Sequence, residues 1–160
     1  MRISLIAAGR LKPGPEKTLA EDYLTRAQGL GRKCGITRIA VTEFSESQAS
    51  SAAARMSEEG RLMAGALPPR AFAVVLDERG KALSSEEFAS LLRRHLEGGT
   101  PDMAFLIGGP DGHAPDIRQQ AGLLMSFGPM TWPHRMVRVM LFEQLYRAVT
   151  ILAGHPYHRA

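Results

Sequence analysis

The residues of this chain that could do chemistry gather in the stretch 103–113, which reads MAFLIGGPDGH. Met103–Ile107 is a short, continuous apolar run, as is typical of a strand buried on both faces of a parallel sheet. Three glycines and a proline follow within residues 108–112, so the backbone there carries few side chains and can adopt positive φ angles. Open α/β sheets bind ligands at the carboxyl ends of such strands. The stretch predicts a ligand-binding loop; from these residues alone, a tight turn without a ligand is the alternative.

Two more segments are expected beside this loop, because the carboxyl ends of parallel strands meet at one edge of a sheet. They are the Gly/Pro-rich loop 128–133 and the strand end at Leu76–Asp77. Their side chains are mostly apolar, as in Leu76, Phe127, Met130 and Trp132. A pocket of backbone amides and carbonyls with apolar walls suits a flat, weakly charged ligand, such as an adenine nucleoside, better than a polyphosphate. For Met130 and Trp132, plain core packing is the alternative.

The sequence lacks the motifs of several other kinds of functional site. It contains no GxxxxGK[ST] phosphate-binding loop, no GxGxxG after the first expected strand and no GxSxG nucleophile elbow. Cys34 is the one cysteine, which excludes an intramolecular disulfide and a CxxC metal site. A zinc site at His155 and His158 would need a third ligand, and Pro156 keeps that pair off a regular helix, so we expect no metal.

Strands and helices alternate along the chain. The expected strands are 3–8, 36–44, 71–76, 103–107 and 123–127, and the expected helices are 16–30, 45–66, one beginning at Ser84, 116–122 and 134–153. Ser84 and Glu87 have the spacing of a capping box, and 77–80 is expected to be a turn. The alternation predicts an α/β fold with a mainly parallel sheet flanked by helices. The three most apolar strands, 3–8, 71–76 and 103–107, are expected at its centre, and residues 1–160 are expected to form a single domain.

Charge is distributed unevenly along the chain, whose formal net charge is +4. Residues 1–38 carry eight Lys and Arg against three acidic residues, and residues 131–160 carry four Arg against one. If the fold brings these ends together, they form a positive patch suited to a phosphate backbone, whereas the alternative is a mixed, solvated surface. No apolar run approaches the length of a membrane span, and the first residues are too short for a signal-peptide core. We therefore expect a cytoplasmic protein.

Three long motifs carry a resemblance to a known family. The segments FLIGGPDGH, SFGPMTWPHRMVRVML and EQLYRAVTILAGHPYHR resemble the RlmH family of SPOUT-class methyltransferases, which methylate N3 of a pseudouridine in 23S ribosomal RNA. The likeness covers the whole length and departs from the family at Asp111 and Trp132. It implies a SPOUT-type α/β trefoil knot in the C-terminal part and S-adenosyl-L-methionine as the cofactor. The cofactor-binding positions that it implies are Leu76, Gly108, Phe127, Gly128, Pro129, Met130, Thr131 and Trp132.

The resemblance also gives the C-terminal tail a role. N3 of a uracil ring must lose its proton, and the resulting negative charge spreads onto two carbonyl oxygens that a cation would stabilise. Of the candidate catalytic residues Tyr157, His158 and Arg159, His158 could accept the proton and Arg159 could hold the carbonyls or a phosphate. Their individual roles stay open, and a frayed, solvated tail is the alternative without the resemblance.

The long last helix carries further candidates. Glu143 and Arg147 lie four residues apart and could simply form an ion pair, whereas Arg138 could face RNA. Met136, Met140 and Phe142 lie beside the main apolar stripe of this helix, and a second apolar face predicts burial in a two-fold homodimer, in line with the resemblance.

The expected RNA site is composite. It would combine the pocket of one subunit with basic residues of its partner, including Arg10 or Lys12, and place His158 and Arg159 over the mouth of the pocket. The partner would be 23S ribosomal RNA, as free RNA, in a subunit or in the assembled ribosome. Two other function classes stay open: a non-catalytic ribosome- or RNA-binding module, and an enzyme that binds another adenine nucleoside. Binding of S-adenosylmethionine by the pure protein would separate them.

Overall fold

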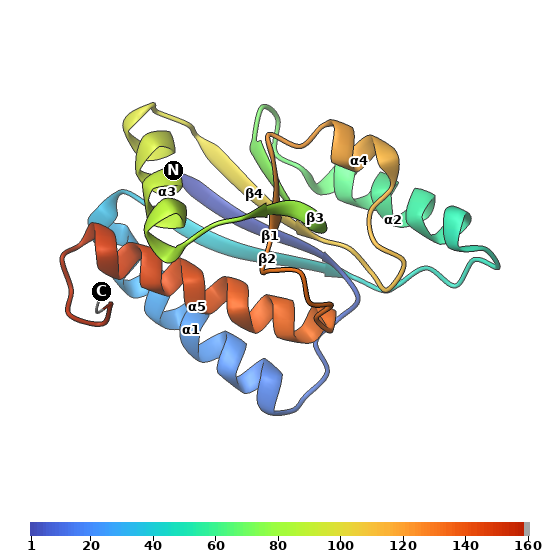
Figure 1. Cartoon of the computed structure of the whole chain (residues 1–160), viewed down its shortest axis with the longest axis horizontal. Coiled ribbons are helices and arrows are strands. Elements are labelled where there is room, and N and C mark those ends of the chain that lie inside the picture. Colours follow the sequence, from blue (N-terminus) through green and yellow to red (C-terminus); the bar gives the residue numbers. More distant parts are fainter. Residues whose placement is uncertain (159–160) are drawn as a thin grey trace.

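The computed structural model describes residues 1–158, which form one sheet with helices on both faces (Figure 1). The strands are β1 (Arg2–Ala8), β2 (Arg38–Phe44), β3 (Phe72–Ala82), β4 (Asp102–Ile107) and β5 (Leu123–Ser126). The helices are α1 (Pro15–Gly31), a 3-10 turn at Arg32–Cys34, α2 (Ala52–Ala66), α3 (Ser85–Glu97), α4 (Pro115–Gln119) and α5 (His134–Leu152). Within the described part of the chain, no helix combines the length and the apolar character needed to cross a bilayer.

The sheet is parallel throughout and has the strand order β2-β1-β4-β3-β5. This order confirms that the three most apolar strands lie at the centre. All six residues of β4 are buried, because β4 has a strand on either side and helices over both faces. The carboxyl ends of β1, β3, β4 and β5 therefore point to one edge. The trefoil knot in the C-terminal part stays a prediction.

The two faces of the sheet are covered by different helices. Alternate residues of β1 belong to different clusters, with Leu5 packing against residues of α1, α3 and α5 and Ile6 packing near Met63 of α2 and Ile117 of α4. Figure 1 shows α1 and α5 lying side by side on one face and α2 and α4 together on the other. The first and last helices are thus neighbours, as the basic-patch hypothesis requires.

Helix α2 is shorter than predicted, because its cap lies within the expected helix. The hydroxyl of Ser51 accepts a hydrogen bond from the amide of Ala54 at 3.2 Å, so the helix begins at Ala52, and residues 45–51 are not helical. The prediction of a helix from residue 45 was wrong in its first turns. In α3, by contrast, Ser84 and Glu87 form the predicted capping box, with hydrogen bonds of 3.1 and 2.8 Å.

Strand β3 continues through the residues that were expected to form a turn, so that prediction was wrong. Its pairing with β5 shifts register between Leu76 and Lys81, both of which lie opposite Met125. A side chain at Gly80 would meet the backbone nitrogen of Met125 at 2.5 Å, so only glycine permits this close approach. The irregular segment 77–80 bends away from the ladder and forms one wall of the cavity described next.

Candidate functional site

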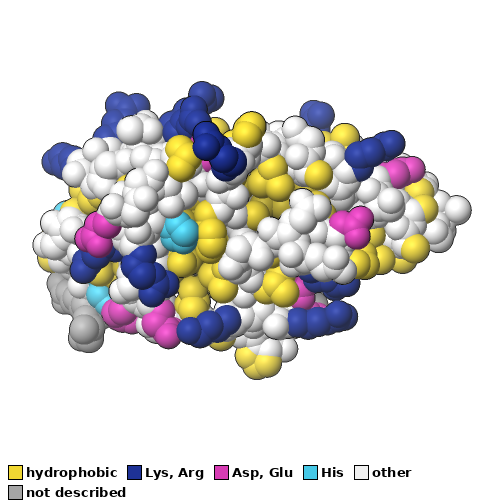
Figure 2. All heavy atoms as spheres, turned by 90° about the horizontal axis from the view of Figure 1, so that it is seen from above, with side chains coloured by type: hydrophobic (Ala, Val, Ile, Leu, Met, Phe, Trp, Pro, Cys, Tyr) yellow, Lys and Arg dark blue, Asp and Glu magenta, His cyan; other side chains and the backbone are white. Residues whose placement is uncertain are grey.

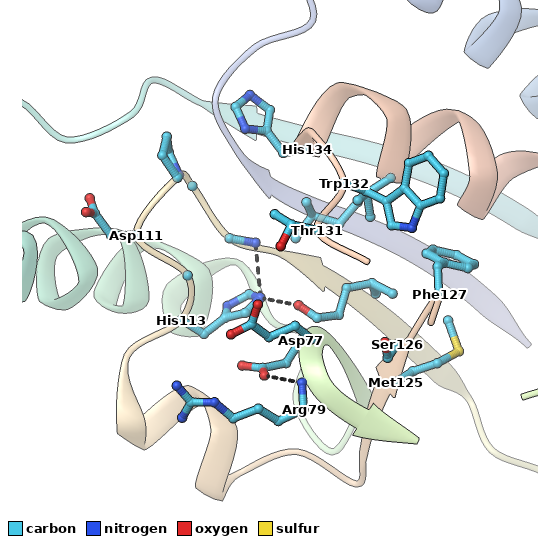
Figure 3. Close-up of a pocket in the computed structure, with 18 of the residues that line it drawn as sticks. Asp77, Arg79, Asp111, His113, Met125, Ser126, Phe127, Thr131, Trp132 and His134 are labelled. Atoms are coloured by element: carbon cyan, nitrogen blue, oxygen red, sulfur yellow. Dashed lines mark hydrogen bonds between the residues drawn. The ribbon is translucent and has the colours of Figure 1, made fainter. Parts of the chain in front are cut away.

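A cavity of about 270 Å³ lies at the carboxyl ends of β3, β4 and β5, beside the first turn of α5 (Figure 3). Its walls include seven of the eight positions expected to bind a cofactor, namely Leu76, Gly108, Phe127, Gly128, Met130, Thr131 and Trp132. Pro129 is exposed and does not line it. The structure thus brings together three segments that are far apart in sequence, as the strand pattern predicted.

The loop 108–112 is held in place from behind by side chains of α2. Asp111 accepts two hydrogen bonds from the guanidinium of Arg55, at 2.6 and 3.0 Å, and these bonds lower the pKa of Asp111 below its usual value. The buried carboxylate of Glu59 lies directly behind Gly109, where an added Cβ would meet it at 2.7 Å. Gly109 and Gly112 also form an isolated β-bridge. This wall is therefore formed before any ligand arrives.

Gly108 is required because the loop folds tightly against it. A Cβ on this residue would meet the carbonyl oxygen of Gly112 at 2.9 Å and the ring of His113 at 3.3 Å. The side chain would therefore point into the loop itself and not into the open part of the cavity. Substitution here is therefore expected to displace the loop.

The loop 127–133 forms few hydrogen bonds with the rest of the protein. Its backbone is bonded at its two ends: Gly128 forms two hydrogen bonds with the hydroxyl of Ser126, at 2.8 and 3.1 Å, and the carbonyl of Pro133 accepts from the amides of Met136 and Val137 in the first turn of α5. Met130 is 71% exposed and Trp132 is 41% exposed, so the core-packing alternative does not hold for either side chain. Figure 3 shows Trp132 and Phe127 on the same side of the cavity. This wall can adapt to a ligand or a partner, whereas the wall at 108–112 is rigid.

Charged groups of both signs line the floor and rim of the cavity. Asp77 is 3.6 Å from the guanidinium of Arg118, and it accepts a hydrogen bond from the amide of Arg79 at 3.0 Å. Glu78 and Arg79 are exposed at the rim. An adenosyl amino acid carries an apolar ring, a cationic sulfonium and a zwitterionic amino acid, so both the apolar walls and the paired charges fit such a ligand.

His113 is a buried residue of this site that sequence reasoning did not select. Its Nε2 lies 3.0 Å from the amide nitrogen of Gly108 and 3.1 Å from the carbonyl oxygen of Leu76 (Figure 3). Burial lowers the pKa of His113, so the ring is neutral near pH 7. The signal in the sequence was the position of this histidine directly after the glycine-rich loop.

The tail lies at the opposite end of α5 from the cavity. His134 at the start of α5 lines the cavity, whereas the tail contacts Glu143 and Arg147, which lie about 14 and 20 Å further along the helix axis. His158 contacts Glu86 of α3 at 2.8 Å. Within one chain, therefore, His158 does not lie over the mouth of the pocket, and Arg159 lies outside the described residues.

A compact polar cluster joins this tail to the last turns of α5. Glu143 accepts hydrogen bonds from Arg147 at 2.9 Å and from the hydroxyl of Tyr157 at 3.1 Å, which confirms the predicted Glu143–Arg147 pair. The guanidinium of Arg147 also lies 4.9 Å from the centre of the Tyr157 ring. Burial raises the pKa of Tyr157, so its hydroxyl is a hydrogen-bond donor and not a base near pH 7. The tail is an ordered part of the molecule through Tyr157, unlike a frayed end.

Two expectations about α5 were wrong. Arg138 cannot face RNA, because it is 1% exposed and its guanidinium bonds Glu43 and the carbonyl oxygens of Ala8 and Gly9. Phe142 cannot belong to a second apolar face, because it is buried in the core of its own chain. Met136 is 37% exposed and Met140 is half-buried, so these two remain available to a partner.

The basic residues of the two chain ends are partly neutralised. Arg2, Arg26 and Arg135 pair with Asp102, Asp22 and Glu16. Five exposed cations of the first 38 residues have no ion pair within residues 1–158: Arg10, Lys12, Arg32, Lys33 and Arg38. Figure 2 shows Lys and Arg side chains along the margins of the face that it presents, around a central hydrophobic area, and not in one continuous patch. Within the described part of the chain, no three His, Cys, Asp or Glu side chains form a group that could hold a metal.

Comparison with known proteins places the chain in a family. Residues 1–158 match the family described as predicted SPOUT methyltransferase. The chain is 52% and 53% identical to proteins of two Rhodopseudomonas palustris strains, HaA2 and ATCC BAA-98 / CGA009, and 51% identical to one of Bradyrhizobium diazoefficiens. Each is named Ribosomal RNA large subunit methyltransferase H, and each alignment covers 100% of both chains. The chain belongs to the SPOUT methyltransferase family.

Proposed function

We propose that this protein transfers a methyl group from S-adenosyl-L-methionine to N3 of a pseudouridine in the 23S RNA of the large ribosomal subunit, in the cytoplasm. The observation that carries the proposal is the cavity where Leu76, Gly108 and the segment 127–132 converge at the carboxyl ends of three parallel strands. Its combination of apolar side chains with backbone amides and carbonyls suits an adenine nucleoside. The names of the relatives, which specify ribosomal RNA of the large subunit, support the choice of substrate.

The residues present fit this cofactor. Leu76 offers a carbonyl oxygen at the inner end of the cavity, which Gly108 also lines, and Phe127 offers an apolar wall. Nearer the rim, Asp77 and Glu78 can balance a cationic sulfonium, and Arg79 can pair with the carboxylate of the amino acid. When bound, S-adenosylmethionine supplies an electrophilic methyl group on a sulfonium.

The base to be methylated makes separate demands on the protein. N3 gives up its proton to a base, and its electron pair then forms the bond to the methyl carbon as the carbon–sulfur bond breaks. This needs in-line alignment and a cation near the two ring carbonyls. His158 is the proposed proton acceptor and Arg159 the proposed cation, and Tyr157 holds the tail on α5 through Glu143. This assignment keeps the cofactor residues and the tail residues in different roles.

The distance between tail and cavity leads us to propose a homodimer with shared sites. Two α5 helices that pack antiparallel about a two-fold axis place the C-terminal end of each beside the N-terminal end of the other. Exposed apolar side chains suited to such packing occur on neighbouring helices, namely Leu19 on α1 and Met136 on α5, which are 45% and 37% exposed. In this arrangement the tail of one subunit serves the cavity of its partner, and Arg10 and Lys12 add cations for RNA.

The homodimer is tested by sedimentation at micromolar concentration. Met136→Asp is expected to shift the protein toward monomer, because a buried carboxylate in an apolar interface is costly. Leu62→Asp is the matched control, because Leu62 is 49% exposed on α2, on the opposite face of the sheet. A monomeric parent protein, or equal behaviour of the two variants, would contradict the proposed interface.

The function itself is tested on ribosomal RNA. Mass spectrometry should show that 23S RNA from a deletion strain lacks one methyl group on a pseudouridine. The pure protein with S-adenosylmethionine should restore this methyl group. Free RNA, large subunits and assembled ribosomes are offered separately, which identifies the substrate form. RNA affinity should fall steeply with salt, since several phosphates are neutralised. Binding to ribosomes without methyl transfer would favour the non-catalytic RNA-binding module instead.

A further inference from the structure

His113 presents one ring nitrogen to two backbone groups of opposite polarity. Nε2 lies 3.0 Å from the amide nitrogen of Gly108, which can only donate, and 3.1 Å from the carbonyl oxygen of Leu76, which can only accept. Figure 3 draws both contacts converging on this nitrogen. Gly108 directly follows β4 and Leu76 lies where the register of β3 shifts, so the ring spans the two strands that frame the inner end of the cavity.

A neutral imidazole cannot satisfy both groups at once. The ring is 3% exposed, and Asp77 and Arg118 act on it with opposite signs. One nitrogen of a neutral ring donates and the other accepts, so Nε2 either accepts from Gly108 or donates to Leu76. Nδ1 has no hydrogen-bond partner within residues 1–158 and cannot relieve the conflict. In either tautomer, one of these two backbone groups is left without its hydrogen bond to His113.

The two backbone groups are not equally open to a ligand. Gly108 is buried and its amide has a single proton, so an amide bonded to His113 is fully used. Leu76 is half-buried, and its carbonyl oxygen has two lone pairs. The group that can turn to a ligand is therefore the Leu76 carbonyl, and a ligand there must bring a donor.

We propose that His113 is a positioning residue whose tautomer is selected by the ligand: the bound nucleoside donates to the Leu76 carbonyl, and Nε2 then accepts from Gly108 with the ring proton on Nδ1. This rests on the proposed function in taking the adenine amino group as the donor. Without a ligand, both tautomers are populated. The arrangement favours an adenine, which has an amino group at C6, over a hypoxanthine, which has a carbonyl there.

The tautomer is read by NMR of protein labelled with ¹⁵N histidine. The chain has five histidines, and the spectrum of His113→Gln assigns the signal of His113. On addition of S-adenosylhomocysteine, the ¹⁵N chemical shift of Nε2 should change from the average of the two tautomers to the value of an unprotonated nitrogen. The ¹⁵N chemical shifts of His95, whose Nδ1 contacts Thr100 at 2.9 Å on a different part of the molecule, should not change. A protonated Nε2 in the complex would overturn the proposal.

Calorimetry gives a second readout that does not depend on turnover. His113→Gln places an amide N–H against the Leu76 carbonyl, where it competes with the ligand donor, so affinity for S-adenosylhomocysteine should fall roughly tenfold. The matched control His95→Gln should leave affinity unchanged, and S-inosylhomocysteine should bind the parent protein more weakly than S-adenosylhomocysteine. Equal affinity of the two nucleosides, or of parent and His113→Gln, would contradict the inference.

The NMR and methyl-transfer results together distinguish a failure of the positioning role from a failure of the proposed function. If S-adenosylhomocysteine shifts the ¹⁵N signal of His113 Nε2 as expected but no methyl group is transferred to ribosomal RNA, the proposed function is wrong and the positioning role stands. If methyl transfer proceeds while Nε2 stays protonated in the complex, the function stands and the positioning role fails. If no adenine nucleoside binds, both are overturned.

Discussion

At its N-terminal end, α5 begins against the loops of the cavity, whereas its second half contacts the tail through the cluster of Glu143, Arg147 and Tyr157. The first end offers apolar walls and backbone groups, and the second offers a carboxylate, a guanidinium and the histidine of the tail. In a single chain, the cavity at His134 and the tail cluster at Glu143 and Arg147 are therefore about 14 to 20 Å apart along the axis of α5. This separation supports the proposal that the tail of one subunit serves the cavity of its partner.

The largest expected effect comes from removing the tail. Deletion of residues 157–160 should lower methyl transfer about 100-fold or more, because both the proton acceptor and the stabilising cation are lost. Affinity for S-adenosylmethionine should change by no more than a few-fold, since the cavity at the other end of α5 is intact. Single-turnover assays on the RNA substrate and calorimetry, run side by side, measure the two effects. Survival of turnover would break the division of roles and move the base to Glu143 or Arg147.

Mixing two inactive proteins sharpens the same comparison. A tail-deleted chain has an intact cavity, and a Gly108→Val chain has an intact tail. If the tail acts on the partner, the mixed dimer contains one complete site and activity returns. If the tail acts on its own chain, no site in the mixture is complete and activity stays absent.

The next effect concerns the rigid wall of the cavity. Gly108→Val should remove measurable affinity for S-adenosylmethionine and also lower the melting temperature, because its side chain would collide with the Gly112 carbonyl. Gly29→Val is the control, since a Cβ at this helical position would meet no atom within 4 Å apart from its chain neighbours and the backbone of its own helix. Calorimetry and thermal unfolding report the two losses. Unchanged affinity in Gly108→Val would reject the role of this loop.

Sequence patterns predicted the framework of the site well, because the apolarity of a strand depends on local residues. The run at 103–107 placed β4 at the centre, and the Gly/Pro composition of 108–112 and 128–133 located two walls of the cavity. The spacing of Ser84 and Glu87 likewise specified a cap that forms within four residues. These features need no knowledge of distant partners.

What sequence patterns missed depends on contacts between distant segments. Arg138 looked like a surface cation, but its partner Glu43 lies 95 residues away in the chain. His113 gains its role from Leu76, 37 residues away, and the extension of β3 requires Gly80 to approach Met125 of another strand. The tail residues could be named, but their distance from the cavity could not, because it depends on the direction and length of α5 within the fold.

A smaller effect tests what anchors the cavity end of α5. Arg138→Met should destabilise the protein by about 3 kcal/mol, because it removes a buried guanidinium and leaves the Glu43 carboxylate and two carbonyl oxygens without their partner. Arg135→Met, three residues earlier, should cost no more than about 0.5 kcal/mol, since its ion pair with Glu16 is exposed. Urea denaturation of the two variants measures the difference. Similar losses would mean that Arg138 is not an anchor.

The smallest expected effect is the dependence of stability on pH through Asp111, which ties the rigid wall to α2. Hydrogen bonds from Arg55 hold the pKa of this carboxyl below its usual value in the folded protein. A lowered folded pKa means that the stabilisation is fully present above the unfolded pKa of about 3.9 and is lost as the pH falls through the folded value. Asp111→Asn should therefore be slightly less stable than the parent from pH 5 to pH 8, with a gap that narrows below about pH 4.

The matched control for this last prediction is Asp116→Asn, because Asp116 is exposed and has no ion pair within residues 1–158. Urea denaturation at several pH values should show a narrowing gap for Asp111→Asn and no comparable gap for Asp116→Asn. Affinity for S-adenosylmethionine should fall only a few-fold in Asp111→Asn, because Glu59 and the Gly109–Gly112 bridge still support the loop. A gap of constant size down to pH 3 would mean that the ionised Arg55–Asp111 pair does not hold the wall, and that the backbone of the loop is sufficient to keep it in place.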